Sequence, residues 1–261
     1  MGDSQRTAPT PMKISPTPAQ AAHAFITPHL FKAKAPAASP VPDLHVAGPQ
    51  GDLGVWTAGS GPAVLLVHGW EGNHLDLGAF VEPLVAAGRR VVSLDLPAHG
   101  VSAGTRGSIP DLAAGVRAVA DAIGPVEAVI AHSIGSPVTV LALDDGLACQ
   151  RVALISPPMR YTDFARATAH QVGVDPDGVV EALRDLGIDI DRLDVSTMAP
   201  RLRQQALLIH SAEDRVTSVE TTRKIAANWA GSRMIEVKGL GHRRILRDPT
   251  VIETVVDFVV G

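Results

Sequence analysis

The chain has 261 residues, of which 46% are apolar and 19% are charged, and its formal net charge is −4. This composition suits a globular protein with a sizeable core, and the lack of any Lys/Arg run argues against nucleic acid or an anionic membrane surface as a partner. The single cysteine, Cys149, excludes an internal disulfide framework. No stretch of sequence reaches the roughly 18 apolar residues that cross a bilayer, so we expect no membrane span.

Residues 1–43 are predicted to form a proline-rich N-terminal arm, because eight of the 20 prolines fall within the first 42 residues. Clustered prolines favour extended chain, and we predict only one short helix, around residues 18–26. The segment AAHAFITPHLF is interrupted by Pro28 and two histidines, which argues against a signal peptide and makes a cytoplasmic location the expectation. The arm could cover a site, mediate contacts between copies of the chain or stay mobile, so its role and the oligomeric state are left open.

From residue 44 the pattern changes to strands that alternate with helices. LHVAG and DLGVWTAG, separated by the turn PQG, predict a hairpin. Six further apolar runs predict strands: AVLLVHG, RRVVSLDL, VEAVIAHS, RVALIS, QALLIHS and SRMIEVKG. Helical patterns between strands indicate a mostly parallel sheet with helices on both faces. We therefore predict an α/β core over residues 44–156 and 205–261.

Residues 157–204 break this alternation. They contain no convincing strand, and FARATAHQ, DGVVEALRDLG and MAPRLRQ have the spacing of short helices. An insertion at this point would lie over the carboxyl ends of the strands, which is where ligands bind in open α/β sheets. We predict a short helical cap there.

Ser133, in the stretch AHSIGS, is a candidate nucleophile. It stands where a predicted strand ends and a helix begins, and Ala131 and Gly135 beside it are small. This is the context of a nucleophile elbow, a sharp turn that exposes the serine hydroxyl. The alternative is a serine that only caps the helix.

A serine hydroxyl needs a base, and the base needs an acid that orients it. Asp214 follows the strand QALLIHS and His242 follows the strand SRMIEVKG, so both should lie on the same edge of the sheet as Ser133. Ser133, Asp214 and His242 are therefore the predicted triad. Glu213 beside Asp214, and Asp163 after RVALIS, are the less favoured acids.

The reaction also needs hydrogen-bond donors for the oxyanion that forms in the transition state. We predict the backbone N–H groups of Ile134, directly after the nucleophile, and of Trp70, in the turn after AVLLVHG. The side chains of Trp70, His74 and Met159 are candidates for the substrate pocket. His132 is expected to be buried behind the nucleophile, and His68 and His99 to tie loops together.

With these motifs assembled, residues 44–261 resemble the α/β-hydrolase superfamily, on a serine-nucleophile, esterase-like branch. The resemblance rests on LLVHGWEGN, SLDLPAHGVS, AHSIGS, HSAEDRV and GLGHRRIL. It implies an eight-stranded, mostly parallel sheet, a helical cap after the sixth strand, and the three triad residues in these positions. Two positions depart from the usual pattern, because Ala98 and Ala131 stand where glycine is common.

The resulting functional hypothesis is a serine hydrolase that cleaves carboxylic esters of small to medium acyl chains. No cofactor or metal is expected, because no His/Cys/Asp cluster has metal-ligand spacing. Alternatives that use the same triad are acyl transfer, C–C bond hydrolysis and cofactor-free perhydrolysis, and a remote one is a non-catalytic ligand-binding protein. Arg243 and Arg244 could attract an acidic substrate, although solvated surface charge is the favoured interpretation.

Overall fold

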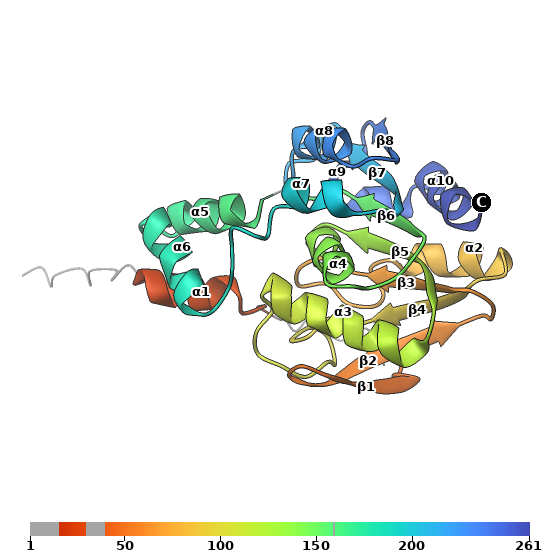
Figure 1. The fold of residues 1–261 in the computed structure, drawn as a ribbon, viewed down its shortest axis with the longest axis horizontal. Coiled ribbons are helices and arrows are strands. Elements are labelled where there is room, and N and C mark those ends of the chain that lie inside the picture. The colour runs from red at the N-terminus through yellow and green to blue at the C-terminus, as the bar shows by residue number, and fades with distance from the viewer. Residues whose placement is uncertain (1–15, 30–39, 159) are drawn as a thin grey trace, which may run out of the picture.

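The computed structural model describes residues 16–29, 40–158 and 160–261. These residues form one eight-stranded sheet in the order β1-β2-β4-β3-β5-β6-β7-β8 (Figure 1). The strands are β1 (Leu44–Gly48), β2 (Gly51–Ala58), β3 (Ala63–Val67), β4 (Arg90–Leu94), β5 (Val126–His132), β6 (Arg151–Ile155), β7 (Gln205–Ser211) and β8 (Ser232–Val237). β1 and β2 form an antiparallel hairpin, β2 is also antiparallel to β4, and all other pairs are parallel. The predicted α/β-hydrolase sheet is confirmed.

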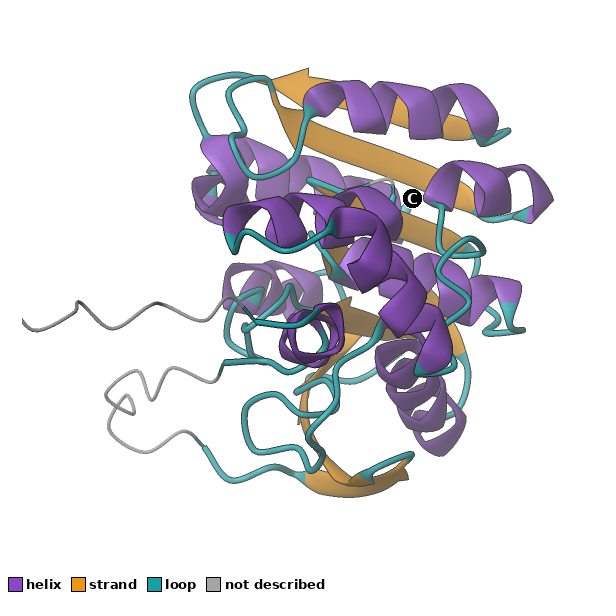
Figure 2. Ribbon diagram, turned by 90° about the vertical axis from the view of Figure 1, so that its left-hand side faces the viewer, coloured by secondary structure: helices purple, strands orange, loops and turns teal. Residues whose placement is uncertain are grey.

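Helices cover both faces of this sheet, as Figure 2 shows. The helices of the core are α2 (Val81–Ala86), α3 (Ile109–Ile123), α4 (Gly135–Asp144), α8 (Val219–Asn228), α9 (Gly241–Arg244) and α10 (Pro249–Val260), with 3₁₀ turns at Gly78–Phe80 and Ile245–Arg247. A further 3₁₀ turn, Ala199–Arg201, lies in the insertion before β7. Apolar side chains of α3, α4 and α8 pack on one face, and those of α2 and α10 pack on the other. The central strands are buried on both faces, which explains why β3 is apolar at every position.

The insertion between β6 and β7 carries three helices, α5 (Tyr161–Gln171), α6 (Pro176–Asp185) and α7 (Val195–Met198). The helix predicted near residues 18–26 is α1 (Pro18–Phe25), and it packs against α5 and α6 (Figure 1). Thr17 caps α1 through a capping box with Gln20. The remainder of the predicted arm, apart from residues 16–29 and 40–43, lies outside the described residues.

Candidate active site

Ser133 lies at the tip of a strained turn between β5 and α4. Its φ is +51°, a left-handed value that is uncommon for a residue with a side chain. Its backbone N–H donates to the carbonyl of Ile155 at 2.9 Å, which fixes the turn against β6. A Cβ at Gly135 would lie 2.6 Å from the carbonyl oxygens of Val67 and His68, so only glycine fits there. The small residue two positions after the serine, Gly135, is therefore required by close backbone packing, as the motif predicted.

His242 and Asp214 form a hydrogen-bonded row with this serine. The Ser133 hydroxyl lies 3.0 Å from Nε2 of His242, and Nδ1 of the same ring lies 2.7 Å from Oδ2 of Asp214. Nδ1 donates to the carboxylate, which leaves Nε2 free to accept from the hydroxyl. The structure thus brings together the three residues that the sequence placed at one sheet edge.

Asp214 is held in the ionised form by its hydrogen bonds. Burial alone would raise the pKa of its carboxyl, but donors from His210 and His242 lower it well below the usual range. The backbone N–H groups of Val216 and Thr217 donate to its Oδ1 at 2.8 and 3.1 Å. A permanently charged carboxylate is suited to stabilise a protonated imidazole.

Among the described residues, the two alternative acids have hydrogen-bond or ion-pair partners other than His242. Glu213 accepts hydrogen bonds from the backbone N–H of Gly239 at 2.6 Å and from the hydroxyl of Ser211 at 3.2 Å. Asp163 lies on α5, where 60% of its side chain is exposed and it forms an ion pair with Arg160. The geometry therefore favours Asp214 as the acid.

His210 and Thr217 contact Asp214 on the side away from His242's ring nitrogen Nε2, and neither was predicted from the sequence to belong to the site. Nε2 of His210 donates to the carbonyl of Thr217 at 3.0 Å and lies 3.4 Å from Oδ2 of Asp214. The hydroxyl of Thr217 also donates to that oxygen, at 3.2 Å. A histidine at the end of a strand, four residues before the acid, is the available sequence signal.

His132 is buried and hydrogen-bonded next to the nucleophile, and His68 ties two loops together, as predicted for each. Nε2 of His132 lies 2.9 Å from the carbonyl of His242. Burial lowers the pKa of His132 to about 4, so the ring is neutral at pH 7 and Nε2 carries the donated proton. Nδ1 of His68 bonds the carbonyl of Gly69 at 2.7 Å, while its Nε2 accepts from the N–H of Leu96 at 3.0 Å.

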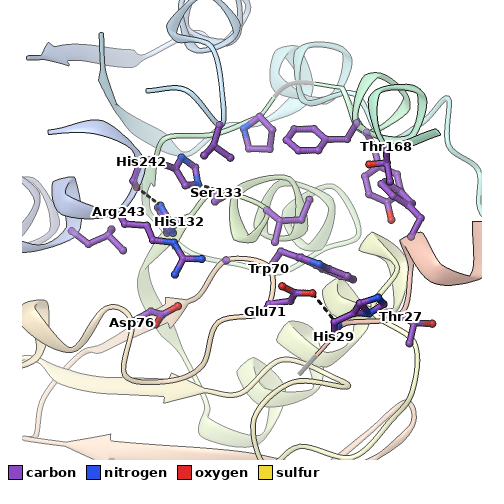
Figure 3. Close-up of a pocket in the computed structure, with 18 of the residues that line it drawn as sticks. Thr27, His29, Trp70, Glu71, Asp76, His132, Ser133, Thr168, His242 and Arg243 are labelled. Atoms are coloured by element: carbon purple, nitrogen blue, oxygen red, sulfur yellow. Dashed lines mark hydrogen bonds between the residues drawn. The ribbon is translucent and has the colours of Figure 1, made fainter. Parts of the chain in front are cut away.

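A cavity of about 640 Å³ opens in front of Ser133 (Figure 3). Trp70 and Ile134 line it. A Cβ at Gly69 would lie 3.3 Å from Cβ of Ser133, so the loop that carries Trp70 packs closely against the serine. The role of the Trp70 and Ile134 N–H groups as oxyanion donors stays a prediction.

The cavity has two unlike ends. At one end lie aromatic and small side chains from α1 and α5, including Phe25, Tyr161 and Phe164. At the other end lie charged residues, namely Asp76, Arg243, Arg244 and Arg247, whereas Glu71 lies beside His29, next to α1 (Figure 3). Figure 3 shows Arg243 and Asp76 near His242, with Thr27 and Thr168 on the far side.

Arg243 and Arg244 line the cavity and are also exposed to solvent, which agrees with the solvated surface charge that the sequence favoured. The Arg244 guanidinium donates to the carbonyls of Gly239 and Leu240, at 2.9 and 3.0 Å. These bonds tie Arg244 to the loop that precedes His242.

The prediction for His74 is wrong, because this residue does not line the cavity. Its ring stacks on Trp56 with centroids 3.4 Å apart, and its Nδ1 bonds Asp95 at 3.0 Å, which keeps the ring inside the protein. Met159 lies outside the described residues.

Within residues 16–29, 40–158 and 160–261, no group of three or more His, Cys, Asp or Glu side chains is arranged to hold a metal ion. In the same ranges, no helix has both the length and the apolar character needed to cross a membrane.

The fold and the serine turn define an α/β hydrolase. The chain belongs to the alpha/beta hydrolase family, whose sequence model matches residues 64–203. A stretch of 99 residues is 42% identical to the dihydrolipoyllysine-residue acetyltransferase component of the acetoin cleaving system of Pseudomonas putida. That stretch covers 37% of this chain and 26% of the relative, so the chain matches about a quarter of that protein's length.

Two solved esterase structures share the fold over most of the chain. The esterase EaEST from Exiguobacterium antarcticum has a TM-score of 0.68 and 18% identity, over 83% of this chain and 99% of its own. A thermophilic esterase from Thermogutta terrifontis has a TM-score of 0.67 and 18% identity, over 83% of this chain and 97% of its own. At this identity the likeness concerns the fold.

Proposed function

We propose that the protein is a serine hydrolase that cleaves carboxylic esters of small to medium acyl chains. The observation that carries the proposal is the row from the Ser133 hydroxyl through His242 to Asp214, with bonds of 3.0 and 2.7 Å at the floor of a cavity. A nucleophile, a base and an orienting acid within hydrogen-bond reach are what acyl transfer to serine requires.

In the first half of the proposed reaction, Ser133 attacks the ester carbonyl while Nε2 of His242 takes the hydroxyl proton. Asp214 orients the ring and stabilises its positive charge. The N–H groups of Trp70 and Ile134 bind the oxyanion. His242 then gives its proton to the leaving alcohol, and an acyl-enzyme ester remains on Ser133.

In the second half, His242 takes a proton from water, and the hydroxide attacks the acyl-enzyme. Collapse of this second tetrahedral intermediate returns the proton to Ser133 and releases the acid. No step needs a metal or an organic cofactor. The expected partner is therefore a small-molecule ester.

The first experiment is hydrolysis of a series of p-nitrophenyl esters from acetate to palmitate, with Ser133→Ala beside the wild type. We expect hydrolysis that depends on Ser133 and declines for the longer acyl chains of the series. Hydrolysis that persists in Ser133→Ala, or a folded wild type inactive on every ester, would overturn the proposal.

Acyl transfer is the second candidate, because the acyl-enzyme can react with an acceptor other than water. The relative from Pseudomonas putida carries the word acetyltransferase in its name, which is the observation that favours this alternative. Adding alcohols during hydrolysis distinguishes the two reactions. A hydrolase forms mainly free acid, whereas a transferase forms mainly the new ester at low acceptor concentration.

A further inference from the structure

The N-terminal segment 16–29 is a wall of the cavity, although it lies far from Ser133 in the sequence. Ala24, Phe25, Thr27 and His29 all line the cavity. The match to the family begins at residue 64, so this wall lies outside the matched region. The cavity therefore contains a feature that the family alone does not predict.

Apolar contacts hold this segment against the cap. α1 packs on α5 and α6, and the rings of Phe25 and Tyr161 lie with centroids 5.0 Å apart. Ala22 and Ile26 are fully buried. Burial of these two apolar side chains stabilises the position of the helix.

Two backbone hydrogen bonds hold the other end of the segment beside the Trp70 loop. The N–H of His29 donates to Oε1 of Glu71 at 3.0 Å, as Figure 3 shows, and the carbonyl of Ile26 accepts from the N–H of Gly107 at 2.7 Å. A Cβ at Gly107 would lie 2.9 Å from the Trp70 ring and 3.2 Å from Pro28. The segment thus spans from the cap helices to the residue predicted to bind the oxyanion.

The chemistry of the walls assigns the two ends of the cavity to different parts of a substrate. The end built by α1 and α5 presents Phe25, Tyr161 and Phe164, whereas the end near His242 presents Asp76 and Arg243. An apolar chain placed among the charged groups would strip water from them without replacing their hydrogen bonds, which is unfavourable. The same chain placed against the aromatic rings is favourable.

We propose that residues 16–29 form the far wall of an acyl-binding subsite for a linear apolar acyl group, and that Phe25 limits the length of that group. This inference rests on the proposed ester hydrolysis. Phe25 is half-buried, so its ring reaches the cavity while its contact with Tyr161 holds it in place. The alcohol part of the ester then lies toward Arg243.

Two substitutions on α1 test the wall in opposite directions. Phe25→Ala lengthens the subsite, so we expect kcat/KM for long-chain p-nitrophenyl esters to rise about tenfold relative to the acetate, the effect of filling a hydrophobic pocket with further methylenes. Ala24→Phe, at an exposed position that lines the cavity, shortens the subsite and lowers the same ratio. Phe258→Ala on α10 is the matched control, because Phe258 is half-buried outside the cavity, and it leaves the ratio unchanged.

The measurements separate failure of this inference from failure of the proposed function. If the wild type hydrolyses acetate through Ser133 and both α1 variants keep the wild-type chain-length profile, the wall is overturned while the hydrolase stands. The wall is also overturned if the variants change selectivity along a series of alkyl acetates, which vary only the alcohol, but not along the acyl series. Because Phe25→Ala removes a contact with the cap, thermal melting checks its fold, and Ala24→Phe supplies the test if Phe25→Ala does not fold.

Discussion

Two histidine–aspartate pairs in this protein are built alike and placed differently. Asp214 follows β7 and bonds His242 at 2.7 Å, while Asp95 follows β4 and bonds His74 at 3.0 Å. In both aspartates, hydrogen bonds from the partner histidine and from backbone N–H groups lower the pKa of the carboxyl against the opposite effect of burial. The pairing itself therefore does not identify an active site.

The two pairs differ in the surroundings of Nε2, the histidine ring nitrogen that does not face the aspartate. Nε2 of His242 faces the Ser133 hydroxyl in the cavity, whereas Nε2 of His74 is buried and has no partner among the described residues. The His74 ring is covered by Trp56. A histidine–carboxylate pair becomes a candidate for catalysis when the ring reaches a nucleophile and a substrate-sized space.

Asp95 instead joins two loops. Its Oδ1 accepts from the backbone N–H of His74 at 2.7 Å, and its Oδ2 accepts from that of Val101 at 2.8 Å. A Cβ at Gly100 would lie 1.8 Å from Oδ2, so the glycine lets the loop close around the carboxylate. We assign this pair a structural role.

The largest expected effect on activity comes from replacing the nucleophile, which belongs to neither pair. Ser133→Ala removes the attacking oxygen, so kcat/KM for p-nitrophenyl acetate should fall by about 10⁴-fold or more, as when a triad serine is removed. Thermal melting should show a folded protein. Activity within tenfold of the wild type would mean that another group attacks the ester.

Asp214→Asn should produce the next largest effect. The amide cannot balance the charge of protonated His242 and favours the wrong tautomer, so we expect kcat to fall about 10³- to 10⁴-fold. The N–H groups of Val216 and Thr217 can still bond the amide oxygen, which preserves the loop. Steady-state kinetics on p-nitrophenyl acetate measures the loss.

Asp95→Asn is the matched change in the other pair. It should lower the stability of the protein and leave its activity largely intact. The amide nitrogen would face one of the two backbone N–H groups that the carboxylate now accepts, so a buried donor loses its partner. We expect the free energy of unfolding to fall by about 2–3 kcal/mol, with kcat reduced less than tenfold. Guanidinium unfolding beside the kinetics of Asp214→Asn completes the comparison, and equal kinetic losses in the two variants would contradict it.

The position of the His242–Asp214 pair can be predicted from the sequence better than that of the His74–Asp95 pair, for a physical reason. Ser133, Asp214 and His242 each follow a strand, and parallel strands bring their carboxyl ends to one edge, so spacing along the chain predicts proximity. His74 lies in a long loop, and its position depends on a stack with Trp56 of β2. The spacing of residues along the chain does not predict such a contact.

The N-terminal wall was equally hard to predict in full. Proline content and local pattern predicted α1 close to its observed bounds, Pro18–Phe25. Its docking on α5 and α6 depends on burial of Ala22 and Ile26 against a distant part of the chain. A short helix carries too few apolar positions to specify its partner, which explains why three roles for the arm stayed open.

A smaller effect, on the pH dependence of stability, is expected from the buried neutral histidine that lies beside each pair. Burial lowers the pKa of His132, next to His242, to about 4, and that of His68, which accepts from the N–H of Leu96 beside Asp95, to about 3. Below the unfolded pKa of about 6.5 the unfolded chain binds protons that these folded rings do not, so stability falls as the pH falls. The loss is about 1.4 kcal/mol per pH unit for each ring, from pH 6.5 down to its folded pKa.

Guanidinium unfolding between pH 7.5 and 4.5 measures this slope. His132→Gln removes one titrating ring while keeping an N–H donor toward the His242 carbonyl, so its slope should be shallower by about 1.4 kcal/mol per pH unit. Equal slopes in wild type and His132→Gln would show that the ring is not buried as a neutral group.

The smallest expected effect concerns the strain stored in the serine turn, a feature that neither histidine–aspartate pair possesses. At φ +51°, Ser133 and an alanine in its place both hold a left-handed conformation that glycine adopts without steric cost. Ser133→Gly should therefore unfold with a free energy about 1 kcal/mol higher than Ser133→Ala, while both variants are inactive. The opposite order is expected at Ser136, inside α4, where glycine is about 1 kcal/mol worse than alanine. If glycine were the less stable residue at both positions, the turn would carry no strain, and exposure of the Ser133 hydroxyl would come at no conformational cost.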